Sequence, residues 1–193
     1  MIPLLLIRHG RTEWNAQKKL QGRRDIPLSS EGREILETCE IPEQFSHFHW
    51  RSSPLKRAEQ TAQILGATDL VLDDRLIEMD WGKWEGYTIR ELRAQYGSAM
   101  KDNEAKGLQM CPEGGESPAD VQNRLLPFLQ ELKTPTIAVT HKGVIRAIKS
   151  LAYNWDMTDK SPVPFNWNAG HLFMIDELGR PHAEAVNIEL DVA

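Results

Sequence analysis

A short hydrophobic run near the start of the chain, Leu4 to Ile7, ends abruptly in Arg8, His9 and Gly10. An apolar run of this length, closed by polar residues, is typical of a strand that is buried on both faces of a sheet. It is far shorter than the roughly 18 apolar residues of a membrane span, and we also expect it to be too short for the core of a signal peptide. The run therefore predicts a buried first strand that carries a cation, an imidazole and a glycine at its carboxyl end.

Further apolar runs alternate with segments of helical spacing through the 193 residues. Strands that alternate with helices predict a mostly parallel sheet covered on both faces. The last two expected strands flank Glu177–Arg180 and predict an antiparallel hairpin. The expected strands are Leu4–Arg8, Phe48–Ser52, Leu70–Leu72, Thr136–Thr140, His171–Ile175 and Ala185–Leu190, and the expected helices are Ser30–Glu37, Leu55–Leu65, Ile89–Tyr96, Ser117–Leu132 and Gly143–Ala152.

Two segments show neither the apolar run of a strand nor the spacing of a helix. Ser161–Pro164 is rich in proline and predicts a loop, and Ala99–Gly115 is expected to be irregular. A long irregular segment in a compact domain is either functional or a plain surface connection. Ala99–Gly115 is therefore either part of a lid over a site or a long connection.

The charge balance and the cysteine count limit the partners and the compartment. With 23 basic and 28 acidic residues the net charge is −5, which argues against a nucleic-acid binder. It does not exclude a small anionic substrate, because a few arginines in one pocket reverse the local field. Cys39 and Cys111 form no disulfide framework, so we expect a cytoplasmic protein. The negative charge and the lack of a long apolar run also argue against a membrane partner. A homodimer through a sheet edge or an apolar lid remains open.

Three further segments place polar residues where strands meet helices. Residues 51–62 run strand, turn and helix, and put Arg57 in a first helical turn beside free amide donors that favour anions. Thr140-His141 repeats this arrangement, and residues 76–86 place carboxylates among aromatic residues and glycines, where desolvation can keep a carboxyl protonated. Ligands of open α/β sheets bind at the carboxyl ends of the strands. Two histidines and two arginines at these ends outline a phosphate site.

In this order the segments resemble the histidine phosphatase superfamily, the group that includes cofactor-dependent phosphoglycerate mutase. The resemblance covers most of the chain. It implies a three-layer α/β/α sandwich, residues 1–193 as a single domain, and a small lid inserted at about residues 79–116. The segments that carry it are Arg8-His9-Gly10, Ser53-Pro54 with Arg57 and Thr61-Ala62, Glu78 with Gly82 and Glu85-Gly86, and Thr140-His141 with Gly143.

The resemblance also assigns roles. By it His9 is a nucleophile that becomes phosphohistidine, Glu78 is the proton donor, and His141 completes the catalytic set. Arg8 and Arg57, again with His141, match the phosphate pocket. The remaining matches are Asn15, which reaches the phosphate in many members, and Gln21, Gly22 and Arg23, which resemble a loop that closes on the substrate.

These residue types suit phosphoryl transfer, which depends on positioning and charge neutralisation. Arginines hold phosphate oxygens in bidentate fashion, and their charge disfavours protonation of His9, which keeps its lone pair free. His141, if protonated, adds a donor. Glu78 protonates the leaving alkoxide and then takes a proton from the hydrolytic water. Because guanidinium groups stabilise the developing charge, no metal and no other cofactor are expected.

The sequence predicts a metal-independent phosphomonoesterase acting on a small phosphorylated metabolite. A phosphoglycerate mutase is the first alternative, but mutases of the group carry paired arginines in the lid and residues 99–115 contain none. Residues 80–86 also resemble the phosphatase branch that includes α-ribazole and broad-specificity phosphatases. The second alternative is a non-catalytic phospho-ligand binder, which has no need of both a nucleophile and an acid.

Several residues keep two interpretations. Trp81 and Trp84 suit a substrate pocket as well as a core, and Arg23 with Arg24 suits a second substrate anion or a basic surface. Lys142 with Arg146 keeps the same two interpretations as Arg23 with Arg24. The residues expected to be solvated or structural are His47, His49, His171 and His182, and the rivals to Glu78 as the acid are Glu13, Asp80 and Glu85.

Overall fold

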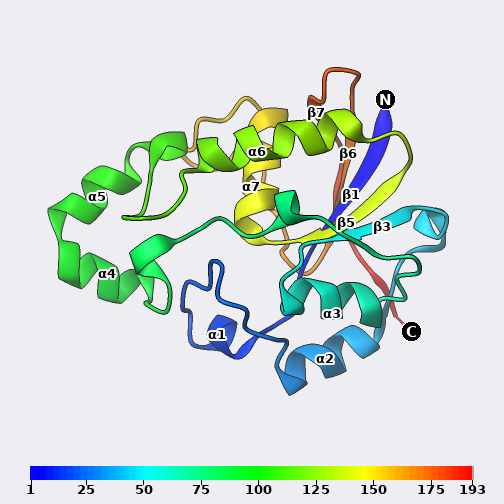
Figure 1. The fold of residues 1–193 in the computed structure, drawn as a ribbon, viewed down its shortest axis with the longest axis horizontal. Coiled ribbons are helices and arrows are strands. Elements are labelled where there is room, and N and C mark those ends of the chain that lie inside the picture. The colour runs from blue at the N-terminus through cyan, green and yellow to red at the C-terminus, as the bar shows by residue number, and fades with distance from the viewer. Residues whose placement is uncertain (193) are drawn as a thin grey trace.

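A six-stranded sheet organises the chain in the computed structural model, which describes residues 1–192 (Figure 1). The strand order is β4-β3-β5-β1-β6-β7, and β4, β3, β5 and β1 run parallel while β6 and β7 pair antiparallel. The mostly parallel sheet expected from the sequence is confirmed. The strands are β1 Ile2–Arg8, β2 Cys39–Glu40, β3 His49–Ser52, β4 Val71–Leu72, β5 Thr136–Thr140, β6 Gly170–Ile175, β7 Pro181–Ile188 and β8 Asp191–Val192.

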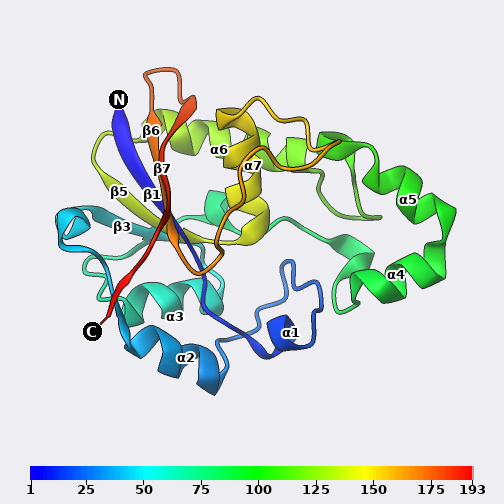
Figure 2. The same cartoon turned by 180° about the vertical axis from the view of Figure 1, so that it is seen from behind.

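Helices cover both faces of this sheet, which gives the expected three-layer sandwich (Figures 1 and 2). α6 and α7 pack on one face, and α2 and α3 lie on the other. The helices are α1 Glu13–Ala16, α2 Ser30–Glu37, α3 Lys56–Ile64, α4 Ile89–Tyr96, α5 Ser98–Glu104, α6 Pro118–Glu131 and α7 Lys142–Ala152.

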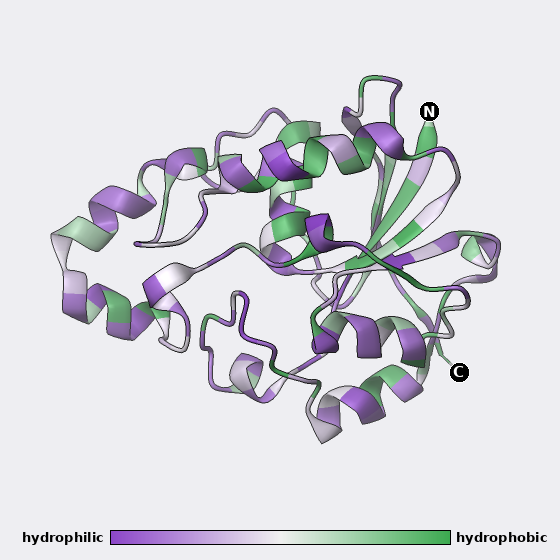
Figure 3. Cartoon of the chain, viewed as in Figure 1, coloured by the Kyte–Doolittle hydropathy of each residue, from purple (hydrophilic) through white to green (hydrophobic). Residues whose placement is uncertain are grey.

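β1 explains why the sheet needs both layers. Leu4 and Leu6 belong to the apolar cluster under α6 and α7, whereas Leu5 and Ile7 belong to the cluster under α2 and α3. Successive side chains of a strand point to opposite faces, so one continuous apolar run supplies both cores. The hydrophobic colour runs along β1 in Figure 3. No helix among the described residues is long and apolar enough to cross a bilayer.

α4 and α5 extend away from the sheet (Figure 1). They have a small apolar cluster of their own, which contains Trp84, Leu92 and Met100. The expectation of an irregular segment at Ala99–Gly115 was wrong for its first part, because α5 and a 3₁₀ turn at Gly107–Gln109 lie there. α5 is short and Met100 is its one buried residue, so it shows no apolar periodicity in the sequence.

Other differences from the expected elements are local. β7 begins at Pro181, four residues before the expected strand start at Ala185. Pro181 opens an edge strand, which is a position where proline is tolerated. The short elements α1, β2 and β8 were not expected, since four or fewer residues carry too little pattern to detect.

Candidate active site

The carboxyl ends of three neighbouring strands bring the candidate residues together. The amide of His9, just after β1, donates to the carbonyl of Thr140 at the end of β5 (2.9 Å). The amide of Ser53, just after β3, donates to the carbonyl of Val139 (3.0 Å). The polar segments after these strands therefore meet at one edge of the sheet, as the sequence predicted.

His9 is buried at this edge with a defined tautomer. Its Nδ1 lies 2.7 Å from the carbonyl oxygen of Gly10, and because a carbonyl only accepts, Nδ1 carries the proton. Burial lowers the pKa of His9 well below its usual value, and the charges of Arg57 and Arg8 lower it further. The ring is therefore neutral at pH 7, with a free lone pair on Nε2.

His141 lies beside His9 and is also neutral. The two ring centroids are 5.1 Å apart, and Nε2 of His141 lies 2.7 Å from the Ser53 hydroxyl. Burial, with Arg57 and His9 as the next causes, lowers the pKa of His141 well below its usual value. The site therefore disfavours the protonated His141 that the sequence analysis allowed for. Ser53 was not recognised from the sequence as a contact of this ring.

Two arginines supply the positive charge. Arg57 is fully buried on α3 and donates to the carbonyls of Gly22 (2.8 Å) and Arg24 (2.7 Å). Its Nε is buried without a hydrogen-bond partner, and so is the Nε of Arg8. The described residues contain four such unpartnered buried side-chain atoms, and Nδ1 of His141 is a third one at this site. Buried polar atoms without partners are costly, and because the two arginine Nε groups can only donate, their clustering indicates a place for an anion.

Glu78 is the buried carboxyl of the site. Its Oε1 accepts from the amide of Met79 (2.8 Å) and its Oε2 from that of Gly143 (3.4 Å). Burial raises the pKa of Glu78, although the charges of Arg57 and Arg8 oppose this rise. A cluster that contains a neutral imidazole and a carboxyl with a raised pKa has the two groups that acid–base chemistry at a phosphate requires.

The rival carboxylates are placed less well for proton donation. Glu13 is exposed, Asp80 accepts from the amide of Gly82 (2.8 Å), and Glu85 accepts from the amide of Arg23 (2.7 Å). Of these residues and Glu78, only Glu78 is buried.

A polar support behind Glu78 was missed at the sequence level. Arg124 of α6 donates to the carbonyls of Arg75 (2.6 Å) and Ile77 (2.7 Å), and its Nε donates to Glu116 (2.9 Å). Glu116 also accepts from the amide of Asp80 (2.9 Å). These bonds fix the chain on both sides of Glu78. No motif marks them, because the partners are mostly backbone atoms distant in sequence.

The remaining expected phosphate and loop residues lie around the same centre. The side-chain oxygen of Asn15 accepts from the amide of Thr12 (3.0 Å), and that of Gln21 lies 2.9 Å from the Thr12 hydroxyl. Gly22 has a positive φ of 53° and holds Arg57 through its carbonyl. Nε of Arg23 donates to the carbonyl of Glu78 (3.3 Å). Asn15 lines a cavity of about 340 Å³ together with Arg8 and His9.

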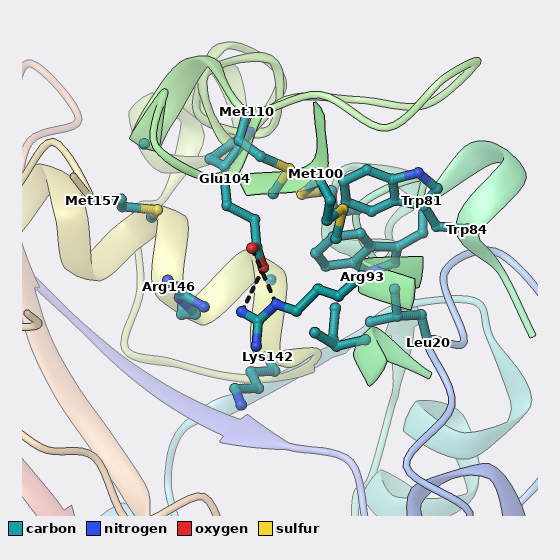
Figure 4. Close-up of a pocket in the computed structure, with 15 residues that line it drawn as sticks. Leu20, Trp81, Trp84, Arg93, Met100, Glu104, Met110, Lys142, Arg146 and Met157 are labelled. Carbon is teal, nitrogen blue, oxygen red and sulfur yellow. Dashed lines mark hydrogen bonds and ion pairs between the residues drawn. The ribbon is translucent and has the colours of Figure 1, made fainter. Parts of the chain in front are cut away.

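A second cavity is lined by residues of α4 and α5 and by residues of α7, among them the cations Lys142 and Arg146 (Figure 4). The sequence left Lys142 and Arg146 open between a solvated surface and the binding of a second substrate anion. Both line this cavity, together with Trp81 and Trp84.

The other histidines lie away from the site. His47 and His49 are exposed, as expected, and His171 is buried against the ring of Phe165, 3.9 Å between centroids. No cluster of three or more residues able to ligate a metal occurs within residues 1–192.

Comparison with known proteins assigns this architecture to a family. A model of the histidine phosphatase superfamily, branch 1, matches residues 4–186. Glucosyl-3-phosphoglycerate phosphatase of Mycolicibacterium vanbaalenii is 35% identical over 75% of this chain and 71% of its own length. Phosphoserine phosphatase 1 of Hydrogenobacter thermophilus is 33% identical over 77% of this chain and 74% of its own.

Solved structures agree with this assignment. The structure of mycobacterial glucosyl-3-phosphoglycerate phosphatase complexed with VO3 superimposes with a TM-score of 0.80 at 25% identity, over 98% of this chain and 100% of that one. The chain therefore belongs to branch 1 of the histidine phosphatase superfamily, and the phosphatases among its relatives agree with the enzyme class expected from the sequence, a phosphoric monoester hydrolase.

Proposed function

We propose that this chain is a metal-independent phosphomonoesterase that hydrolyses a small phosphorylated metabolite through a phosphohistidine at His9. The observation that carries the proposal is the group of buried, unpartnered nitrogens of Arg8, Arg57 and His141 around a neutral His9. A phosphoryl group offers three acceptor oxygens to such donors.

The residues support two balanced steps. Nε2 of His9 forms a bond to phosphorus while the bond from phosphorus to the alcohol oxygen breaks, and Glu78 gives its proton to that oxygen. Water then attacks the phosphohistidine, Glu78 takes back a proton, and the bond from phosphorus to His9 breaks to release phosphate. The raised pKa of Glu78 supports the first step, because it favours the protonated donor.

Hydrolysis is favoured over the mutase reaction because mutases of the group carry paired arginines in the lid, and residues 99–115 contain none. Rapid isomer exchange of 3-phosphoglycerate in the presence of a bisphosphoglycerate primer would overturn this choice.

The test is a quenched turnover experiment. Protein mixed with 4-nitrophenyl phosphate and quenched in base should carry a phosphoryl group on the peptide that contains His9, as measured by mass spectrometry, and the His9→Ala variant should not. Turnover in excess chelator should remain unchanged. Turnover without any phosphopeptide, or loss of activity that added metal restores, would contradict the mechanism.

A further inference from the structure

The cavity under α4 and α5 adjoins the proton donor. It measures about 370 Å³, and its lining includes Met79 and Gly143, whose amides hold the two carboxyl oxygens of Glu78. Arg8, His9 and Arg57 do not line it, so its volume is additional to the phosphate pocket. A proton donor must face the leaving oxygen, and the alcohol part of a substrate bound at His9 therefore extends into this cavity.

One side of the cavity is apolar and partly aromatic. The rings of Trp81 and Trp84 are stacked, with centroids 6.2 Å apart and planes inclined by 20°. Met100 and Met110 lie on the same side, whereas Met157 lies beside Arg146 (Figure 4). Methionine thioethers adapt to the shape of a ligand and contact aromatic rings favourably. The lining methionines are Met79, Met100, Met110 and Met157. A small polar alcohol would leave most of this surface without contact, whereas a bulky apolar or aromatic one would cover it.

The opposite side carries uncompensated positive charge. Lys142 and Arg146 of α7 have no carboxylate partner among the described residues. Nζ of Lys142 lies 5.1 Å from the ring of Trp167, and the guanidinium of Arg146 lies 5.5 Å from the ring of Trp155.

The one lining carboxylate is already neutralised. Glu104 accepts two hydrogen bonds from Arg93, at 3.2 and 2.8 Å, as Figure 4 shows. Three cations and one carboxylate leave the lining with a net charge of 3 − 1 = +2. Burial lowers the pKa of Lys142, with Arg8 and Arg146 adding to the effect, and burial lowers the pKa of Arg146; the charge of Glu78 opposes both shifts.

We propose that this cavity selects phosphomonoesters whose alcohol part is bulky and apolar or aromatic and also carries an anionic group, which Lys142 and Arg146 bind. The inference rests on the function proposed above, because it assumes that the phosphate binds at His9. In this proposal Trp81 and Trp84 contact the apolar part of the alcohol, and Lys142 and Arg146 bind its anionic group. These four residues thus determine the substrate specificity.

The test compares probes that differ in the anionic group. Phenyl phosphate and 3-carboxyphenyl phosphate have leaving groups of similar basicity, and only the second carries a carboxylate. A 3-phosphonophenyl phosphate distinguishes a carboxylate from a second phosphorus acid. We expect kcat/KM for 3-carboxyphenyl phosphate to exceed that for phenyl phosphate by about tenfold or more, mainly through KM.

Variants assign the effect to the cations. Arg146→Gln should lower the ratio of kcat/KM between 3-carboxyphenyl and phenyl phosphate by about tenfold, and Arg146→Lys should restore part of it. Lys142→Gln removes the other α7 cation of the cavity and should lower the same ratio independently. Arg90→Gln, the same charge change on an exposed residue of α4 outside this cavity, should leave the ratio unchanged.

The outcomes separate this inference from the proposed function. Hydrolysis of phenyl phosphate as fast as 3-carboxyphenyl phosphate, or a ratio that Arg146→Gln does not change, would overturn the inference and leave the phosphatase intact. Absence of hydrolysis of every probe by the folded wild-type protein would overturn both.

Discussion

The imidazole rings of His9 and His141 lie 5.1 Å apart, centroid to centroid, with their planes tilted by 54°. Both rings are buried, and Arg57 is the charged neighbour that most lowers the pKa of each. Charging either ring would place a second cation beside that arginine in a buried site. Burial and the neighbouring cations therefore hold the pair neutral.

The protonation state of this pair can be measured by NMR of the ring nitrogens. We expect both rings to remain neutral down to about pH 6, because their pKa values lie well below the usual value of about 6.5. Arg57→Gln should raise both pKa values, since it removes a positive neighbour. Arg90→Gln, which removes an exposed charge on α4, is the matched control. A protonated His9 at neutral pH in the wild-type protein would contradict the assignment of the nucleophile.

Replacement of Glu78 tests the proton donor. Glu78→Gln should slow the hydrolysis of alkyl phosphates far more than that of 4-nitrophenyl phosphate, because a nitrophenolate leaves without needing a proton. We expect a difference of about 100-fold between the two losses in kcat, which is within the range of general acid catalysis. Steady-state kinetics with both substrates measures it. Equal losses would point to another donor, with Asp80 and Glu85 as the next candidates.

The support behind Glu78 should matter for catalysis although it touches no substrate. Arg124→Lys removes the fork that holds the carbonyls of Arg75 and Ile77. We expect kcat for alkyl phosphates to fall about 10- to 100-fold, since a misplacement of about 1 Å can cost that much. Arg180→Lys, in the exposed ion pair with Asp176 on the β6–β7 hairpin, is the control.

A pH profile separates this positioning role from a loss of stability. Catalysis needs protonated Glu78, so activity falls as the pH rises through its pKa. If Arg124→Lys lets water reach the carboxyl, that raised pKa falls, and the alkaline limb of kcat moves to lower pH. If Arg124→Lys lowers the melting temperature but leaves the alkaline limb of the kcat profile unchanged, Arg124 only stabilises the fold.

His171 predicts a specific acid sensitivity of the fold. Burial lowers the pKa of His171 to about 4, below its unfolded value of about 6.5. Between these values the unfolded chain binds a proton that the native ring does not, so stability falls as the pH falls from about 6.5 to 4. His171→Asn keeps an acceptor for the amide of Asn187 but does not titrate. It should reduce the loss of unfolding free energy across this window by about 1–3 kcal/mol, measured by urea denaturation. The same loss in both proteins would exclude His171 as the cause.

The parts of the fold that the sequence predicted well are those with strong local signals. β1, β5 and α7 follow from continuous apolar runs and helical spacing, and Arg8, His9, Arg57 and His141 stand at the strand ends where parallel sheets gather their ligands. Where these four residues lie depends mainly on the order of strands and helices along the chain. The structure brings the four residues together at one edge of the sheet, as that order implied.

The parts that the sequence did not predict depend on contacts without a local pattern. α5 buries one methionine and rests on α4 and the neighbouring loops, so neither its spacing nor its composition identifies it. Arg124 and Glu116 support Glu78 through backbone atoms, and Arg146 faces a cavity only because α4 and α5 lie opposite it. Such relations arise from tertiary packing and have no motif.

β1 has a further consequence for how the site is protected. Its alternate residues fill two separate cores, and His9 follows it directly. A slip of one residue would send every side chain of the strand into the wrong core at the same moment as it displaced the imidazole. A register slip that misplaced His9 would therefore also disrupt both hydrophobic cores. A stably folded population thus contains few molecules with a misplaced His9.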